Sequence, residues 1–248
     1  MRAVLIVLLV LAGFRPVAAA DLKVLTAGAF KGVLVEIAPE FEKRTGNKLT
    51  IDNDTAGGLA KRIAAGESFD VVIMPPAGMG PFLGSRLIES SAKPLARAGI
   101  GVAVKQGAAK PDVSSVDIFK QSLLAAKSVA YVDPASGGSS GIYLAKLFEK
   151  LGIAAALQPK TVLVKGGLVG EKIAAGQAEI GLQQMSELLA VSGVAVVGPI
   201  PLEVQNYTIY AGAISTASGN RAADEELMRT LADPHNLPLL QKKGLDGP

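Results

Sequence analysis

The sequence predicts an α/β protein of two lobes that form a clamp and are joined by two crossover strands. Short apolar runs alternate with helical runs along the chain, which is typical of parallel α/β sheets. The runs 70–74 and 100–104 are continuously apolar, as in strands buried on both faces. Two further runs, at 96–104 and 206–214, have the character of crossings between two α/β units.

The first twenty residues have the pattern of an export signal. Arg2 is the basic start, Ala3 to Leu11 form the apolar centre, and Ala18 to Ala20 form a small-residue cleavage site. This apolar run is too short for a good membrane span, which needs about 18 residues. We therefore expect 1–20 to be a signal peptide and the mature chain to be exported.

The elements expected after the signal alternate in type. Apolar runs bounded by turn residues predict the strands, and the helices are predicted from apolar residues spaced by three and four. Lobe 1 is expected to be discontinuous, at 21–97 plus 206–248, with 98–205 as lobe 2. The strands are expected at 22–26, 49–53, 70–74, 100–104, 129–132, 161–164, 179–182, 194–198 and 207–214, and the helices at 30–44, 57–65, 77–84, 114–124, 139–151, 168–175, 184–191 and 222–231.

Three of the expected strands end in small-residue turns that open helices. These turns are 26–29, 55–58 and 135–141. Small residues let backbone N–H groups approach a ligand closely, and a helix N-terminus carries partial positive charge. Several such termini aimed at one point predict a site for a small anion.

The composition limits the kinds of ligand and site that we expect. Of 25 basic residues, Arg2 and Arg15 lie in the predicted signal, and the remaining 23 oppose 22 acidic ones, a net charge of +1 that does not favour nucleic acid. The chain has no cysteine and one histidine, His235, so we expect no disulfide and no transition-metal site. The sequence predicts no cofactor.

The run Gly137 to Gly141 matches the pattern of a hydrolase nucleophile around Ser139. That pattern needs the serine on a turn directly after a strand, whereas about seven residues separate Ser139 from the preceding predicted strand. The spacing therefore disfavours a serine hydrolase.

Four motifs lie at 24–30, 55–66 followed by 69–73, 133–134 with 141–143, and 173–181. In this order and spacing they resemble the periplasmic molybdate-type solute-binding proteins of ABC importers, which have the type 2 periplasmic binding fold, a two-lobed periplasmic-binding-protein-like clamp. The resemblance covers essentially the whole mature chain. It implies a periplasmic, monomeric protein that binds a small anion between its lobes and docks on a membrane permease.

Carried over residue by residue, the family's oxyanion site falls on Ala29, Ala56, Ser140, Gly167 and Gln184. The family has serines at the first two positions and a tyrosine at the last, so this chain lacks those hydroxyls. Losing two hydroxyl donors to a charged ligand costs about 1.5–3 kcal/mol each, which disfavours molybdate and favours an organic carboxylate. Lys31, Lys165, Gln183 and Gln184 are possible donors. The full expected ligand-binding set is Ala29, Phe30, Thr55, Ala56, Gly57, Ser139, Ser140, Lys165, Gly167 and Gln184.

An enzyme is the alternative interpretation. The superfamily also resembles at least one exported enzyme, aconitate isomerase, so the chain is also compatible with an aconitate-isomerase-like periplasmic enzyme acting on a tricarboxylate. Such an enzyme needs a general base in the cleft. The candidates are Lys165, Lys31, Asp54 and the tyrosines, and Asp54 is better explained as a cap or turn residue. No signature selects a catalytic residue, and the sequence favours a binding protein over an enzyme.

Overall fold

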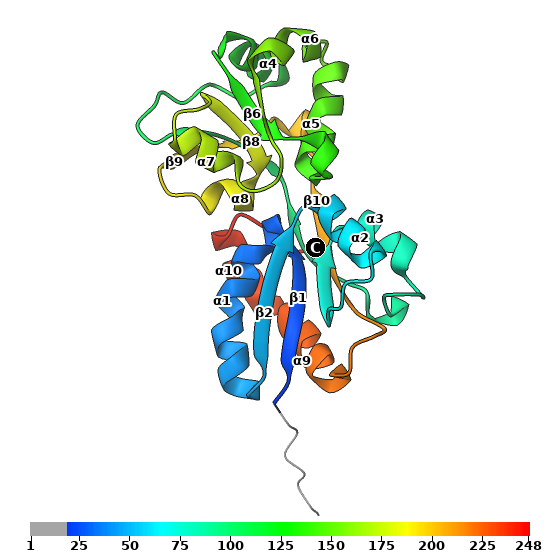
Figure 1. Ribbon diagram of the computed structural model, residues 1–248. Coiled ribbons are helices and arrows are strands. Elements are labelled where there is room, and N and C mark those ends of the chain that lie inside the picture. Colours follow the sequence, from blue (N-terminus) through cyan, green and yellow to red (C-terminus); the bar gives the residue numbers. More distant parts are fainter. Residues whose placement is uncertain (1–18) are drawn as a thin grey trace, which may run out of the picture.

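The structure is a computed structural model that describes residues 19–248. The first 18 residues of the predicted signal peptide lie outside the described residues. The described chain forms two five-stranded sheets, each covered by helices, in two lobes that stand one above the other in Figure 1. This arrangement confirms the predicted two-lobed α/β fold.

The first sheet has the strand order β2-β1-β3-β10-β4. Strands β2, β1 and β3 are parallel, and β10 pairs antiparallel with β3 and with β4. Helix α1 packs on β1, β2 and α9, while α2 packs on β1, β2 and α3. The strands are β1 (Asp21–Ala27), β2 (Lys48–Asp54), β3 (Val71–Met74), β4 (Lys93–Ala98) and β10 (Thr208–Ile214), and the helices are α1 (Gly28–Thr45), α2 (Ala56–Ala64), α3 (Pro76–Met79), α9 (Arg221–Leu231) and α10 (Leu237–Lys242).

The second sheet repeats this arrangement in the order β7-β6-β8-β5-β9. Strand β6 pairs parallel with β7 and β8, and β5 pairs antiparallel with β8 and β9. The strands are β5 (Ile100–Lys105), β6 (Val129–Val132), β7 (Thr161–Val164), β8 (Ile180–Gln184) and β9 (Val194–Pro199), and the helices are α4 (Val116–Ala125), α5 (Ser139–Lys150), α6 (Ala154–Leu157), α7 (Val169–Ala174) and α8 (Met185–Leu189).

The chain changes sheet twice. Strand β4 ends at Ala98 and β5 begins at Ile100, so the outward crossing turns on Gly99 inside the predicted run 96–104. The return runs from the end of β9 at Pro199 to the start of β10 at Thr208. It therefore reaches the first sheet near the beginning of the predicted run 206–214. The lobe boundaries themselves, at 97/98 and 205/206, stay a prediction.

The nine predicted strands are all present, with ends within two residues of the expected ones. The sequence missed β4, whose Pro94 and Arg97 interrupt its apolar pattern; a proline is tolerated there because β4 is an edge strand. The helix predicted at 77–84 was wrong. Only α3 and a 3₁₀ turn at Gly80–Phe82 form, because glycines and Pro81 interrupt the segment.

Each lobe has an apolar core of its own. Phe30, Phe41 and Ile73 are fully or almost fully buried in the first, and Phe119 and Phe148 in the second. The second lobe has a further, smaller cluster that includes Val169 and Ile173. None of these three clusters spans both lobes, so the junction between the lobes can be lined largely by small and polar residues. Among residues 19–248, no helix has the length and apolar character needed to cross a membrane.

Candidate functional site

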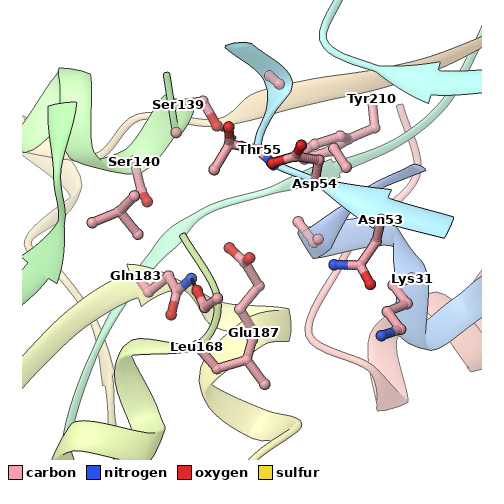
Figure 2. Close-up of a pocket in the computed structure, with 17 residues that line it drawn as sticks. Lys31, Asn53, Asp54, Thr55, Ser139, Ser140, Leu168, Gln183, Glu187 and Tyr210 are labelled. Carbon is pink, nitrogen blue, oxygen red and sulfur yellow. Dashed lines mark hydrogen bonds between the residues drawn. The ribbon is translucent and has the colours of Figure 1, made fainter. Parts of the chain in front are cut away.

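A pocket of about 170 Å³ lies where the two lobes meet (Figure 2). We call its first-lobe side the first wall; it comes from the junctions β1–α1 and β2–α2 and from β10. The second wall comes from β6, the start of α5, the loop before α7, and the β8–α8 junction. The first wall is Ala27, Gly28, Ala29, Lys31, Asn53, Asp54, Thr55, Ala56 and Tyr210, and the second wall is Val132, Gly138, Ser139, Ser140, Gly167, Leu168, Gln183 and Glu187.

Three helices begin at this pocket, α1, α2 and α5. They have 18, 9 and 12 residues. Within the described chain, no side chain caps α1 or α5, so their first N–H groups remain available to a ligand. Helix α2 is capped by Thr55, whose Oγ1 accepts from the backbone N–H of Gly58 at 3.0 Å. The three helix starts give the pocket a partial positive potential that suits an anion.

Hydroxyl groups come from serines of the second wall and a tyrosine of the first. Ser140 is 2% exposed and lines the pocket at the start of α5. Ser139 Oγ lies 3.5 Å from Tyr210 Oη, a contact that joins the two walls. Burial, and secondarily the charge of Glu187, raise the pKa of Tyr210 well above its ordinary value. Tyr210 therefore keeps its proton and acts as a hydrogen-bond donor at physiological pH.

Glu187 is the acid of the pocket whose pKa departs furthest from its ordinary value. It lies in the first turn of α8, and Figure 2 shows its carboxyl group pointing into the pocket. Burial raises the pKa of Glu187 to about 8, and a hydrogen bond with Gln183 opposes this only partly. The carboxyl group abuts the first turn of α1, where a Cβ on Gly28 would lie 2.5 Å from Glu187 Oε1. The glycine at position 28 thus leaves room for this acid.

The charges that line the pocket are few. Lys31 is the only basic side chain among the lining residues, and its side chain is exposed. Asp54 lies at the end of β2, where its Oδ1 accepts from the N–H of Thr55 at 2.7 Å, so it is a turn residue as expected and also lines the pocket. In residues 19–248, no three His, Asp or Glu side chains are grouped as metal ligands would be.

Contacts between the lobes close one side of the pocket. Thr55 Oγ1 donates to the carbonyl oxygen of Ser136 at 2.5 Å, and the N–H of Gly57 donates to the carbonyl oxygen of Gly137 at 3.1 Å. Both bonds join the start of α2 in the first lobe to the turn before α5 in the second. The described conformation is therefore one in which the lobes touch beside the pocket.

Six of the ten residues expected at the site line the pocket, and four lie elsewhere. Phe30 is fully buried in the core of the first lobe, because it occupies the inward face of α1. Gly57 contacts Gly137 instead of the pocket, and Lys165 is exposed in the loop after β7. Gln184 is almost fully buried, where its side chain contacts Ser139, and does not line the pocket. The six that line the pocket are Ala29, Thr55, Ala56, Ser139, Ser140 and Gly167.

Gln184 joins the second lobe to the crossing segments. Both atoms of its side-chain amide have hydrogen-bond partners. Nε2 donates to the carbonyl oxygens of Ala98 and Gly99, at 3.2 and 3.1 Å, and Oε1 accepts from the hydroxyl of Thr208 at 3.0 Å. Gly99 lies at the outward crossing and Thr208 at the start of β10. The glutamine therefore holds the two crossings together rather than facing the ligand.

The sequence missed Glu187, Asn53 and Leu168. Glu187 was inside a helix expected at 184–191, and a single acid in a helix is usually a solvated one. Asn53 directly follows the apolar part of a strand, a position that often faces a site at the carboxyl edge of a parallel sheet. That signal could have found Asn53; nothing in the sequence marks Glu187.

Comparison with known proteins gives a family and two kinds of relative. The family model described as bacterial extracellular solute-binding protein matches residues 22–246. The chain is 37% identical over 231 residues to an aconitate isomerase from Pseudomonas sp, covering 90% of this chain and 87% of that protein.

Solved structures with the same fold include proteins for inorganic oxyanions. The periplasmic molybdate-binding protein of Azotobacter vinelandii superposes with a TM-score of 0.74 at 20% identity, over 92% of this chain and 99% of that one. A sulfate-binding protein from Mycobacterium tuberculosis H37Rv superposes with a TM-score of 0.71 at 12% identity, over 92% and 87%. At these identities the likeness establishes the shared fold.

Proposed function

The chain belongs to the family of bacterial extracellular solute-binding proteins, and within this family we propose that it is an exported isomerase of a small unsaturated tricarboxylate, with Glu187 as the acid–base group. The observation that carries the proposal is a half-buried glutamic acid whose carboxyl group points into the pocket and whose pKa is raised to about 8. The similarity to an aconitate isomerase over 90% of the chain supports it. The sequence favoured simple binding, because no signature in it selects a catalytic residue.

The pocket suits an organic carboxylate better than a tetrahedral oxyanion. Two of the positions where the resemblance implies serine hydroxyls carry the methyl groups of Ala29 and Ala56. Val132 and Leu168 add apolar surface on the opposite wall. Such surface fits a carbon skeleton, while the free N–H groups of α1 and α5 remain for its carboxylates.

A raised pKa lets Glu187 serve in an anion site. Mostly protonated near pH 7, it does not repel a carboxylate, and roughly a tenth of the molecules carry it ionised and ready to accept a proton. A general base works best when its pKa lies near the working pH.

The proposed reaction moves one proton and one double bond. Glu187 removes a proton from the methylene carbon that lies beside a carboxylate and next to the double bond. The electron pair spreads over three carbons, and Glu187 returns the proton to the far carbon, so that the double bond shifts and its geometry can change. No oxidant or further reactant is needed. Charge that develops on the adjoining carboxylate is stabilised by the N–H groups of α1 and α5.

The test is conversion by the purified protein. Incubation with trans-aconitate, followed by chromatography of the cis isomer, is expected to show turnover that Glu187→Gln removes. Glu225→Gln is the matched control, since that acid is 53% exposed on α9 and lies outside the pocket lining. Turnover in deuterium oxide should place solvent deuterium on the product carbon to which Glu187 returns the proton. Equal turnover by Glu187→Gln and the control would exclude Glu187 as the acid–base group.

A second function, delivery of a small anion to an ABC importer in the periplasm, is favoured by the contacts between the lobes beside the pocket. A clamp that closes on its ligand presents one surface to a permease. Stoichiometric binding of a tricarboxylate, detected as a thermal shift but without conversion, would support this function instead. A ligand at 100 times its dissociation constant stabilises by about 2.7 kcal/mol, which such a screen detects readily.

A further inference from the structure

We propose that the glycine pair Gly57 and Gly137 sets how far the two lobes close, and so determines the size of ligand that the pocket accepts. This inference rests on the proposed function only for its ligand. The two residues come from different lobes and meet backbone to backbone. The N–H of Gly57 donates to the carbonyl oxygen of Gly137 at 3.1 Å.

No side chain fits between these two backbones. A Cβ built on Gly57 would lie 2.7 Å from Gly137 Cα, and one built on Gly137 would lie 2.5 Å from Gly57 Cα. Contacts this short with backbone atoms cannot be relieved by moving a flexible side chain. Any larger residue at position 57 must hold the lobes further apart.

The backbone of α2 does not itself require glycine at position 57. Gly57 lies in the first turn of α2, and it is not among the glycines with positive φ. Alanine forms helices better than glycine, so α2 alone would favour alanine there. Gly137 differs, because its φ of 77° ends the 3₁₀ turn before α5. The glycine at 57 is therefore explained by the approach of the second lobe.

The contact between Gly57 and Gly137 lies directly beside pocket-lining residues of both walls. Thr55 and Ala56 precede Gly57, and Ser139 and Ser140 follow Gly137 by two and three residues. Thr55 Oγ1 also caps α2 by accepting from Gly58 N–H, while it donates to the carbonyl of Ser136 across the lobes. Closure and the orientation of the first turn of α2 are thus coupled, and Gly57 acts as a positioning residue.

The first test needs no ligand. Because the chain has no cysteine, Lys61→Cys and Lys146→Cys place one spin label on an exposed position of each lobe. We expect Gly57→Ala to lengthen and broaden the distance distribution between the labels. Gly80→Ala is the control, since a Cβ there meets nothing within 4 Å and its φ of −45° is ordinary. Identical distributions in the Gly57→Ala protein and the control would overturn the proposal, whatever the pocket binds.

The second test is selectivity. With trans-aconitate as the probe, Gly57→Ala should raise the dissociation constant about threefold to tenfold, as expected for losing one backbone hydrogen bond and the fit around it. A bulkier probe, hexane-1,2,6-tricarboxylate, whose carbon chain is three methylenes longer, should lose less affinity than trans-aconitate or gain affinity. The melting temperature of the unliganded Gly57→Ala protein should be unchanged or slightly higher, because alanine forms helices better than glycine. A uniform loss for both probes would contradict size selection, and no binding by wild type would count against the proposed function alone.

Discussion

The two walls of the pocket are built on the same plan and carry different chemistry. In both lobes, parallel strands end at the pocket and helices begin there, because the two sheets share one strand arrangement. The first wall has alanine at both helix starts, whereas the second has Ser139 and Ser140 at the start of α5 and Glu187 on α8. We infer that the shared architecture attracts an anion and that the second wall decides what happens to it.

The largest expected effect tests whether the acid–base group belongs to the second wall. Glu187→Gln should lower turnover of trans-aconitate by about 10²–10⁴-fold, the usual worth of a general base. Asp54→Asn on the first wall should cost less than tenfold, since asparagine can still accept from the N–H of Thr55. A larger loss from Asp54→Asn would move the base to the first wall. In wild type, kcat/KM should rise with pH and level off above about pH 8, the pKa of Glu187.

The same group sets a pH dependence of stability. The pKa of Glu187 is raised from 4.5 to about 8 in the folded protein, so folding favours its protonated form. Its contribution is complete below about pH 4.5 and is lost as the pH rises toward 8, by up to about 1.4 kcal/mol for each unit of pKa difference. Thermal melts from pH 5 to pH 9 should show this loss in wild type and a smaller one in Glu187→Gln. Parallel curves for the two proteins would contradict the raised pKa.

Adding hydroxyls to the first wall should make the walls alike. The double variant Ala29→Ser with Ala56→Ser restores the groups that the resemblance implies for molybdate. Each hydrogen bond to a charged ligand contributes about 1.5–3 kcal/mol, so molybdate affinity should rise by on the order of 10²-fold or more. Calorimetric titration with molybdate measures the change, and Ala60→Ser on α2 is a control outside the pocket lining. An unchanged affinity would show that the alanines do not decide selectivity.

Removing a hydroxyl from the second wall should have a moderate effect. Ser140→Ala should weaken binding of trans-aconitate by about tenfold, because a buried donor to a charged ligand is lost. Ser114→Ala, on an exposed loop, should leave the dissociation constant unchanged. If Ser140→Ala binds as tightly as wild type, the second wall holds its ligand through backbone groups alone.

The smallest effect should come from the lysine of the first wall. Lys31→Gln should weaken binding by fivefold or less, because an exposed charge is largely screened by water and salt. The difference from wild type should shrink between 20 mM and 500 mM salt. Lys61→Gln, an exposed lysine outside the pocket lining, is the control. A loss that persists at high salt would mean that Lys31 contacts the ligand directly.

Much of this protein was determined by its sequence alone. Apolar runs of strand length and the helical periodicity between them predicted nine strands and the two-lobed fold, because those patterns reflect which face of each element must be buried. Small residues at strand ends predicted three helix starts at the pocket, since backbone N–H groups are exposed at any helix start. Six of the ten site residues expected from these turns and from the family resemblance line the pocket.

Tertiary structure alone decided which side chains face the ligand. Phe30 and Ala29 are neighbours in sequence and both are buried in the first lobe, yet only Ala29 also lines the pocket, because a helix turns about 100° at each residue. Glu187 has an ordinary local sequence, and its pKa of about 8 arises from the burial of its carboxyl group in the folded protein, where it lies against Gly28 of the first lobe. Gly57 likewise looks like a helix-start glycine until Gly137, 80 residues later, comes within contact of it. Local patterns encode burial and backbone shape, whereas pKa and lobe spacing depend on groups that only the fold brings together.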